Sequence, residues 1–324
     1  MSDVRPLVSV VMSCFNDESH VAASVDSIRR QSLQNWEFII INDGSTDGTA
    51  AKLDSIASSD SRIRVIHQEN TGLTKALMRG CLEARAEFIA RQDADDLSLP
   101  TRLEKQLKVI QQDDAIGLVS CFADYIGPDD EFLSTVTRPI DPGEATNRLM
   151  KERLGPPAHG TVLFRKSLYE AAGGYRPEFY FGQDADLWLR MVSMKRIAYV
   201  PEVLYLFRWH PGSITGSNRN IQREFGRIGQ ELKEARATGK SEEPLLAEAQ
   251  ALTNQVLQLK ADKTKPTRRE ANRLAMLYQV GSQLVKNRDH RARGYLWTVL
   301  RRQPWNLRAW IRLCQSLLNA RREQ

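Results

Sequence analysis

The first third of the chain alternates between short apolar runs and amphipathic segments. The apolar runs have the length of single strands and cover residues 8–12, 38–41, 63–66 and 88–90. After each of the first three, apolar residues recur every three or four positions, as on one face of a helix. Alternating strands and helices predict an α/β fold with a Rossmann-like, mostly parallel sheet, because right-handed crossovers connect parallel neighbours. Ligands of such sheets bind beyond the carboxyl ends of the strands.

The pattern becomes less regular in the middle of the chain and purely helical at its end. The predicted elements are a helix opened by Pro100, strands at 116–126, 161–164 and 203–207, and a helix at 186–194. Four prolines between residues 139 and 157 predict a mobile connection. Beyond Asn218 only helical periodicity remains. We therefore predict two domains, an α/β domain over residues 1–217 and a helical C-terminal extension over 218–324.

The composition is that of an ordinary soluble globular chain. Hydrophobic residues make up 41% and charged residues 27% of the 324 positions, which excludes the disordered and collagenous classes. No apolar run reaches the ~18 residues of a membrane span, and the amino terminus lacks the pattern of a signal peptide. The cysteines are far apart and form no CxxC pair, so we expect buried thiols in a reducing, cytoplasmic compartment: Cys14, Cys81, Cys121 and Cys314.

The charge is divided unevenly along the chain. Through Asn218 the net charge is −6, whereas the remainder carries +12 within a total of +6. This division predicts two modules with different partners, the basic one facing an anionic surface. A solvated helical face is the other interpretation. Direct nucleic-acid binding is disfavoured, because it needs basic and aromatic residues interleaved on one surface, which the acidic first module lacks.

Polar clusters follow the predicted strands where their carboxyl ends should meet. In the first cluster, Ser13, Phe15 and Asn16 place an aromatic ring and small polar groups where a base and a ribose can lie. The alternative is a strand-end turn that caps the next helix and buries the phenylalanine in the core.

A second cluster contains Asp43, whose carboxylate can accept the imide N–H of a uracil-like base. The following Gly44 lets the backbone approach a ligand closely. The alternative is a helix N-cap, which Ser45 or Thr46 can supply while leaving the carboxylate of Asp43 free.

A third cluster places Asp93, Asp95 and Asp96 at the end of an apolar strand. Three carboxylates this close repel one another unless a cation, a partner or solvent compensates. Mg²⁺ or Mn²⁺ is the natural compensation, since these ions take oxygen ligands and keep positions open for substrate phosphates. A polar loop with several acidic caps is the alternative. A metal-dependent phosphohydrolase needs more ligands, and the chain has only five histidines, widely spread.

These motifs, in their order and spacing, resemble those of the family 2 glycosyltransferases. They read Val-Ser-Val-Val at 8–11, Asn-Asp-Gly-Ser-Thr-Asp at 42–47 and Asp-Ala-Asp-Asp at 93–96, and the resemblance extends over roughly residues 7–215. It implies the type-A glycosyltransferase fold, a nucleotide-binding α/β sheet fused to an acceptor-binding half. The implied roles are base stacking for Phe15, imide recognition for Asp43, ribose binding for Asp93 and metal binding for Asp95.

A fourth family element is an acidic pair before an amphipathic helix, and residues 181–188 occupy its place. Asp184 then matches the catalytic base, with a helix N-cap as its structural alternative. A carboxylate within reach of an acceptor hydroxyl can take its proton during attack on the anomeric carbon, and one such displacement inverts that centre. Arg208 and His210 are candidates to assist at the diphosphate. The family often has a histidine there, and we assign His210 with Asp95 to the metal site.

Two positions depart from the family pattern. Gln183 stands where the family commonly has Glu, and Leu77-Met78 stand where it often has Arg-Asn. Lys75 is the nearby cation that can contact a phosphate of the nucleotide sugar instead. The chain lacks the Gln-x-x-Arg-Trp motif and the transmembrane helices of processive synthases in this family, which favours a bacterial-type transferase that makes single additions.

The resemblance therefore implies an inverting, metal-dependent glycosyltransferase. The favoured donor is a UDP-sugar, and the acceptor is a hydroxyl of a glycan or a lipid-linked glycan in cell-surface polysaccharide or lipopolysaccharide synthesis. The alternative is an inactive glycosyltransferase fold that serves as a binding or scaffold protein through its basic helical tail.

The end of the tail combines apolar and basic residues at helical spacing. The apolar and aromatic residues are Tyr295, Leu296, Val299, Leu300, Trp305, Trp310, Ile311, Leu313 and Leu317. The basic residues among them are Arg291, Arg293, Arg301, Arg302, Arg308 and Arg312. Basic amphipathic helices with Trp commonly lie in an anionic membrane interface, which predicts peripheral attachment at the inner face of the membrane. The alternatives are a helical hairpin with a tryptophan core and a surface for a protein partner.

Overall fold

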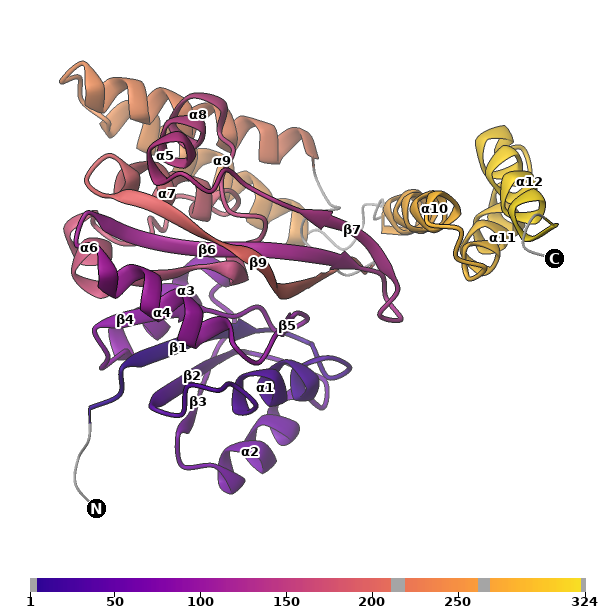
Figure 1. Ribbon diagram of the computed structural model, residues 1–324. Coiled ribbons are helices and arrows are strands. Elements are labelled where there is room, and N and C mark those ends of the chain that lie inside the picture. The colour runs from indigo at the N-terminus through magenta and orange to yellow at the C-terminus, as the bar shows by residue number, and fades with distance from the viewer. Residues whose placement is uncertain (1–4, 211–218, 262–268, 322–324) are drawn as a thin grey trace. The chain divides into compact units, whose positions relative to one another are not determined.

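The computed structural model describes residues 5–210, 219–261 and 269–321. A nine-stranded sheet has the order β3-β2-β1-β4-β8-β6-β9-β5, with β7 paired to β6 (Figure 1). Its strands are β1 (Val8–Cys14), β2 (Trp36–Asp43), β3 (Ile63–Gln68), β4 (Phe88–Arg91), β5 (Leu97–Ser98), β6 (Ile116–Ile126), β7 (Phe132–Val136), β8 (Leu163–Arg165) and β9 (Arg196–Arg208). The first four strands run parallel, whereas the β4–β8, β8–β6 and β5–β9 pairs are antiparallel. The predicted α/β fold is confirmed.

Helices connect the strands and form the C-terminal part of the chain. Those up to β9 are α1 (Val21–Arg29), α2 (Thr49–Ser59), α3 (Leu73–Glu83), α4 (Arg102–Gln112), α5 (Pro142–Glu152), the 3₁₀ turn η1 (His159–Thr161), α6 (Lys166–Ala171) and α7 (Gln183–Val192). The later ones are α8 (Arg219–Ala237), α9 (Glu243–Ala261), α10 (Arg269–Lys286), α11 (Ala292–Arg302) and α12 (Leu307–Arg321). The predicted C-terminal helices are therefore present.

The central strands form because their side chains are covered on both faces of the sheet. Every residue of β2 is buried, and β1 is buried apart from the half-buried Ser13. On one face, α3 comes very close to β1, since a Cβ atom on Gly80 would lie 2.5 Å from Cγ1 of Val11. This approach accounts for a glycine inside a helix, where it costs roughly 1 kcal/mol relative to alanine, and it fixes the start of α3 beside the strand ends.

Residues 142–152 form helix α5, so the prediction of a mobile connection between residues 139 and 157 was wrong there. The carboxylate of Asp141 accepts a hydrogen bond of 2.7 Å from the backbone N–H of Glu144 and caps the helix. Pro142 stands in the first turn, where its missing N–H has no helical partner to lose. The prolines therefore flank or begin this helix and do not break it.

The chain divides into two compact units. The first comprises the chain up to Ala123 together with Val136–Leu206 and Asn220–Leu259, and the second comprises Asp124–Thr135, Phe207–Arg219 and Lys260–Gln324. Helices α8 and α9 thus belong with the α/β unit, where Phe225 of α8 packs against Phe179 and Phe181. The predicted boundary at residue 217 lies outside the described residues, and the two-domain division stays a prediction.

No helix among the described residues has both the length and the apolar character that crossing a bilayer requires. Three of the four thiols are buried, as predicted, in the α/β part of the chain: Cys14, Cys81 and Cys121. Cys314 on α12 is exposed, so the prediction of a buried thiol was wrong there. The buried face of α12 is instead formed by Ala309 and Leu313.

Candidate active site

The loops that follow β1 and β2 are bonded to each other. The two strands are parallel and in register, with Cys14 opposite Asn42 at their carboxyl ends. The side-chain oxygen of Asn16 accepts a 2.7 Å hydrogen bond from the backbone N–H of Thr46, and the N–H of Asn16 donates to the Ser45 hydroxyl at 3.0 Å. Asn16 has a φ of +56°, a left-handed conformation that asparagine tolerates better than most residues. The first two polar clusters therefore lie side by side.

Phe15 projects from the end of β1 with 47% of its surface exposed. The alternative of a core phenylalanine is therefore wrong. An exposed ring at the carboxyl edge of a parallel sheet is available for stacking on a planar group. The neighbouring Ser13 is half-buried in the same strand end.

The carboxylate of Asp43 is buried and holds the loop between β3 and α3. Its Oδ1 accepts hydrogen bonds from the Gln68 amide and from both the backbone N–H and the hydroxyl of Thr71, at 2.8–3.1 Å. Its Oδ2 accepts one from the N–H of Gly72 at 2.8 Å. Asp43 is thus not left free as predicted, and the helix-cap alternative is also wrong for Ser45 and Thr46, because the N-cap of α2 is Gly48. Oδ2 retains a lone pair, since a carboxylate oxygen can accept two bonds.

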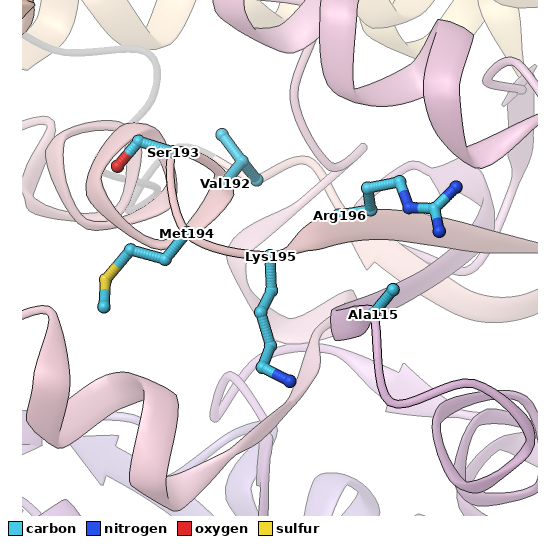
Figure 2. Close-up of a pocket in the computed structure, with 6 residues that line it drawn as sticks. All are labelled: Ala115, Val192, Ser193, Met194, Lys195 and Arg196. Atoms are coloured by element: carbon cyan, nitrogen blue, oxygen red, sulfur yellow. The ribbon is translucent and has the colours of Figure 1, made fainter.

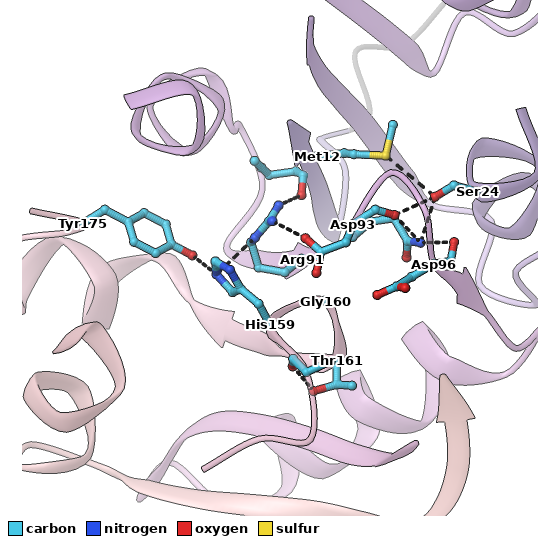
Figure 3. A network of polar contacts seen from close by, with 12 residues as sticks. Met12, Ser24, Arg91, Asp93, Asp96, His159, Gly160, Thr161 and Tyr175 are labelled. Atoms are coloured by element: carbon cyan, nitrogen blue, oxygen red, sulfur yellow. Dashed lines mark hydrogen bonds and ion pairs between the residues drawn. The ribbon is translucent and has the colours of Figure 1, made fainter. Parts of the chain in front are cut away.

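Asp93, just beyond β4, forms an ion pair with the fully buried Arg91, whose Nη2 lies 2.9 Å from Oδ1 of Asp93 (Figure 3). The same guanidinium donates to the carbonyl oxygen of Val11 and, at 3.4 Å, to Nε2 of His159. The hydroxyl of Tyr175 lies 2.6 Å from that same nitrogen. Burial and the charge of Arg91 hold the pKa of His159 well below its usual value, which favours a neutral ring whose Nε2 lone pair faces both neighbours.

Three of the predicted carboxylates act on one another. Burial raises the pKa of Asp93 to about 6; the charge of Arg91 opposes this shift, and the charges of Asp95 and Asp184 add to it. Burial also raises the pKa of Asp184, against the hydrogen bonds from backbone N–H groups at the start of α7. Asp95, two residues away, and Asp184, far away in the sequence, therefore both lie close enough to Asp93 for their charges to act on its carboxylate.

Asp184 lies in the first turn of α7, and Asp186 lies half a turn further on. The side chain of Asp186 is only 1% exposed, and its Oδ2 accepts two hydrogen bonds from the Arg190 guanidinium, at 2.6 and 3.1 Å. A carboxylate enclosed in such a pair cannot reach an acceptor hydroxyl. Asp184 is half-buried, so of the two aspartates Asp184 and Asp186 it is the one whose carboxylate is available for proton transfer.

Within the described part of the chain, no three His, Cys, Asp or Glu side chains gather closely enough to hold a metal ion by themselves. Mg²⁺ usually binds through one or two carboxylates and takes its other oxygen ligands from water and substrate phosphates. The half-buried Asp93 and Asp95, whose charges repel each other, supply oxygen donors of this kind. The residues present thus fit a Mg²⁺ or Mn²⁺ ion that is bound together with a substrate phosphate.

The remaining predicted residues lie elsewhere. Lys75 is exposed in the first turn of α3, one helical turn beyond the loop that Asp43 holds. Arg208 belongs to the second unit, where its buried guanidinium lies 2.6 Å from the carboxylate of Asp130 and donates to backbone carbonyls of the β6–β7 turn. His210 is half-buried in the second unit. The roles of Lys75, Arg208 and His210 toward a ligand stay predictions.

The residues that support Asp93 were not predicted from the sequence. The position of Arg91 at the end of an apolar strand could have indicated its role, because a charged side chain there needs a buried partner. His159 and Tyr175 gave none, since their contact with Arg91 depends on how η1 and the segment before α7 fold back onto β4.

A shallow pocket of about 300 Å³ lies at the opposite end of α7, where the chain turns into β9 (Figure 2). Its lining residues are Ala115, Val192, Ser193, Met194, Lys195 and Arg196. The Ser193 hydroxyl donates to the carbonyl oxygen of Arg190 at 2.6 Å, and Lys195 bonds the carbonyl oxygen of Asp114. The pocket contains no carboxylate and gathers no catalytic group, so we place the candidate site at the carboxyl edge of β1, β2 and β4.

Comparisons with known proteins show which family and fold the chain resembles. Residues 9–173 match the domain described as glycosyl transferase family 2. The putative glycosyltransferase EpsE of Bacillus subtilis is 36% identical over 213 residues, which cover 63% of this chain and 73% of EpsE. The O-antigen biosynthesis glycosyltransferase WbnJ of Escherichia coli is 31% identical over 191 residues, covering 59% of this chain and 73% of WbnJ.

Two solved structures resemble the fold. Residues 1–349 of TarS from S. aureus, in complex with UDP, superpose with a TM-score of 0.55 at 15% identity, over 98% of this chain and 92% of that one. The mannosyltransferase PcManGT of Pyrobaculum calidifontis, in complex with GDP-Man and Mn²⁺, gives a TM-score of 0.55 at 19% identity, over 98% and 87% of the two chains. At these identities the likeness concerns the fold alone.

Proposed function

Because the chain belongs to glycosyl transferase family 2, we propose that it transfers a sugar from a nucleotide sugar to an acceptor hydroxyl with inversion at the anomeric carbon. We propose a UDP-sugar as donor and a glycan or lipid-linked glycan as acceptor, in cell-surface polysaccharide or lipopolysaccharide synthesis. The observation that carries the proposal is the match of residues 9–173 to that family, within which the half-buried Asp93 and Asp95 lie directly after β4. The O-antigen role of WbnJ and the UDP bound to TarS support the pathway and the donor class.

In this proposal Phe15 stacks on the base, Oδ2 of Asp43 accepts the imide N–H and Asp93 binds the ribose. Ser13 and Asn16 border the same nucleotide, and Lys75 contacts its phosphates. Asp184 takes the proton of the acceptor hydroxyl as its oxygen bonds to the anomeric carbon and the bond from that carbon to the diphosphate breaks. Asp95 would hold a Mg²⁺ or Mn²⁺ ion, which would supply a Lewis acid to neutralise the charge of the departing diphosphate. The Mn²⁺ in PcManGT supports that ligand class.

A thermal-shift screen of nucleotide sugars with and without Mn²⁺ tests the function. We expect a cognate donor to raise the Tm by several degrees only when Mn²⁺ is present, since a ligand at 100 times its Kd stabilises by about 2.7 kcal/mol. Transfer of radiolabelled sugar from that donor to a glycan extract then tests for turnover. If no nucleotide sugar shifts the Tm, the scaffold alternative, which acts through the basic tail, replaces this proposal.

We further propose that the transferase attaches peripherally to the inner face of the membrane through α11 and α12. The buried core of this region consists of aliphatic residues, among them Leu296, Val299 and Leu300. The tryptophans lie outside it, with Trp305 80%, Trp297 45% and Trp310 39% exposed. The alternative of a hairpin with a tryptophan core is therefore wrong. Apolar residues are exposed beside them at Leu307, Ile311, Leu317 and Leu318, and the exposed basic residues nearby are Arg301, Arg302 and Arg308.

Co-sedimentation with liposomes tests this attachment. We expect the full chain to pellet with anionic vesicles at low salt, to dissociate as salt rises, and to stay in solution when residues 290–324 are deleted. Trp305→Ala weakens binding without removing a core residue, because this ring is mostly exposed. Vesicles of neutral lipid are the control. Equal pelleting by the truncated chain, or none by the full chain, leaves α11 and α12 as a packing module or a surface for a protein partner.

A further inference from the structure

Helices α8 and α9 enclose the segment that leads into the catalytic helix α7. Phe179 and Phe181 of this segment are buried, and each ring packs against Phe225 of α8 at centroid distances of 5.8 and 6.1 Å. The remaining residues of this core come from both helices: Ile228, Leu232, Ala249 and Val256. Both helices lie beyond residue 173, where the family match ends.

One hydroxyl on α9 holds the backbone of the same segment at two points. The Thr253 hydroxyl donates to the carbonyl oxygen of Glu178 at 2.6 Å and accepts from the backbone N–H of Tyr180 at 3.1 Å. Between these points, the carbonyl oxygen of Phe179 accepts a 2.7 Å hydrogen bond from the Thr74 hydroxyl of α3. The segment is therefore hydrogen-bonded to α9 and to α3 at the same time.

An ion pair adds a third attachment. The guanidinium of Arg176 lies 2.6 Å from the carboxylate of Glu242, at the start of α9, and 3.6 Å from the buried Asp186 of α7. Arg236 of α8 lies 2.5 Å from the other oxygen of Glu242. Hydrogen bonds from the two arginines outweigh the effect of burial and hold the pKa of Glu242 below its usual range. This carboxylate thus joins α8 and α9 to the first turns of α7.

We infer that Thr253, Glu242 and Phe225 are positioning residues that hold Asp184 in its place for proton transfer. Asp184 follows Gly182, which adopts a φ of +70° at the N-cap of α7, so its position is set by the backbone that Thr253 and Arg176 hold. A displacement of about 1 Å at a reacting group can cost ~10²-fold in rate. The inference rests on the proposed transfer reaction, with Asp184 as the base, and it makes α8 and α9 part of the catalytic unit.

Thr253→Val and Thr253→Ser separate the hydroxyl from the packing. Valine keeps the shape but removes both hydrogen bonds, whereas serine keeps the hydroxyl. We expect Thr253→Val to lower kcat roughly tenfold with the donor KM unchanged, and Thr253→Ser to restore most of the activity. Thr238→Val is the matched control, because Thr238 directly follows α8, is exposed, and its hydroxyl donates to carbonyl oxygens of the last turn of that helix.

Amide hydrogen exchange over residues 176–186 provides a readout that does not need turnover. Faster exchange there in Thr253→Val, with wild-type exchange in Thr253→Ser and Thr238→Val, supports the inference even if no acceptor is found. The inference fails if Thr253→Val retains wild-type kcat and exchange, or if valine and serine are equally impaired. Absence of transfer by the wild-type chain with every nucleotide sugar overturns the proposed function instead.

Discussion

Asp184→Asn is expected to lower the turnover of sugar transfer by ~10² or more while leaving the donor affinity unchanged. The amide has nearly the shape of the carboxylate, so α7 keeps its first turn, but it cannot accept the proton of the acceptor hydroxyl. Turnover is measured by steady-state transfer, and donor binding by the thermal shift in the presence of Mn²⁺. A lower kcat with an unchanged donor shift separates the base from the nucleotide-binding groups.

Asp114→Asn is the matched control for this variant. The Asp114 side chain is 94% exposed, and it stands just before the start of β6 and not after the carboxyl ends of β1, β2 and β4. The control should retain wild-type turnover. If Asp184→Asn also retains it, the base lies elsewhere. Asp186, the next candidate by sequence, is enclosed by its pair with Arg190, so Asp93 takes its place, being half-buried and close enough to feel the charge of Asp184.

The parallel half of the sheet could be predicted because β1, β2 and β4 are buried on both faces. A strand of that kind reads as a continuous apolar run, and the polar residues directly after it mark the carboxyl edge. The antiparallel half gave weaker signals, since β8 has only three residues and β9 mixes buried and exposed positions. The four prolines between residues 139 and 157 led to the wrong prediction of a mobile connection at α5, because the pair Asp141-Pro142 is a signal for the start of a helix.

The candidate site could be predicted only as far as its residues are local in sequence. The position of Asp93 and Asp95 after β4 follows from the strand pattern, and Asp184 followed from the family resemblance. The partners of these residues come from distant segments: Arg91 meets His159, and Asp43 meets Thr71. Such contacts depend on tertiary folding, and one sequence without an alignment carries no signal for them.

The tail illustrates the same limit on a single helix. Helical spacing assigns Leu296, Val299 and Leu300 to one face of α11, and this face is the buried one. Trp297 directly follows Leu296 and therefore points elsewhere. Periodicity thus separates Trp297 from the aliphatic face of α11, but only packing decides which face is covered.

The second large effect is expected from Asp95→Ala, which should abolish metal-dependent transfer and leave the fold intact. Asp95 is half-buried in the loop after β4, and its charge repels that of Asp93. Its removal therefore relieves a repulsion in the folded state while withdrawing an oxygen ligand from the proposed ion. Transfer is measured over a titration of Mn²⁺, and the Tm of the variant is measured without ligand.

Asp96→Ala supplies the contrast, because Asp96 is fully buried one residue further along the same loop. Removing a fully buried side chain leaves a cavity in the packing around the loop, so this variant should lose thermal stability. Asp95→Ala should instead keep its Tm and lose both turnover and the Mn²⁺-dependent shift with the donor. Unchanged turnover in Asp95→Ala would show that Asp95 does not bind a metal ion needed for transfer. A loss of turnover that high Mn²⁺ restores would show that Asp95 contributes to binding the ion but is not essential for it. Comparing the two variants thus distinguishes a carboxylate that binds an ion from a carboxylate that the loop needs only in order to fold.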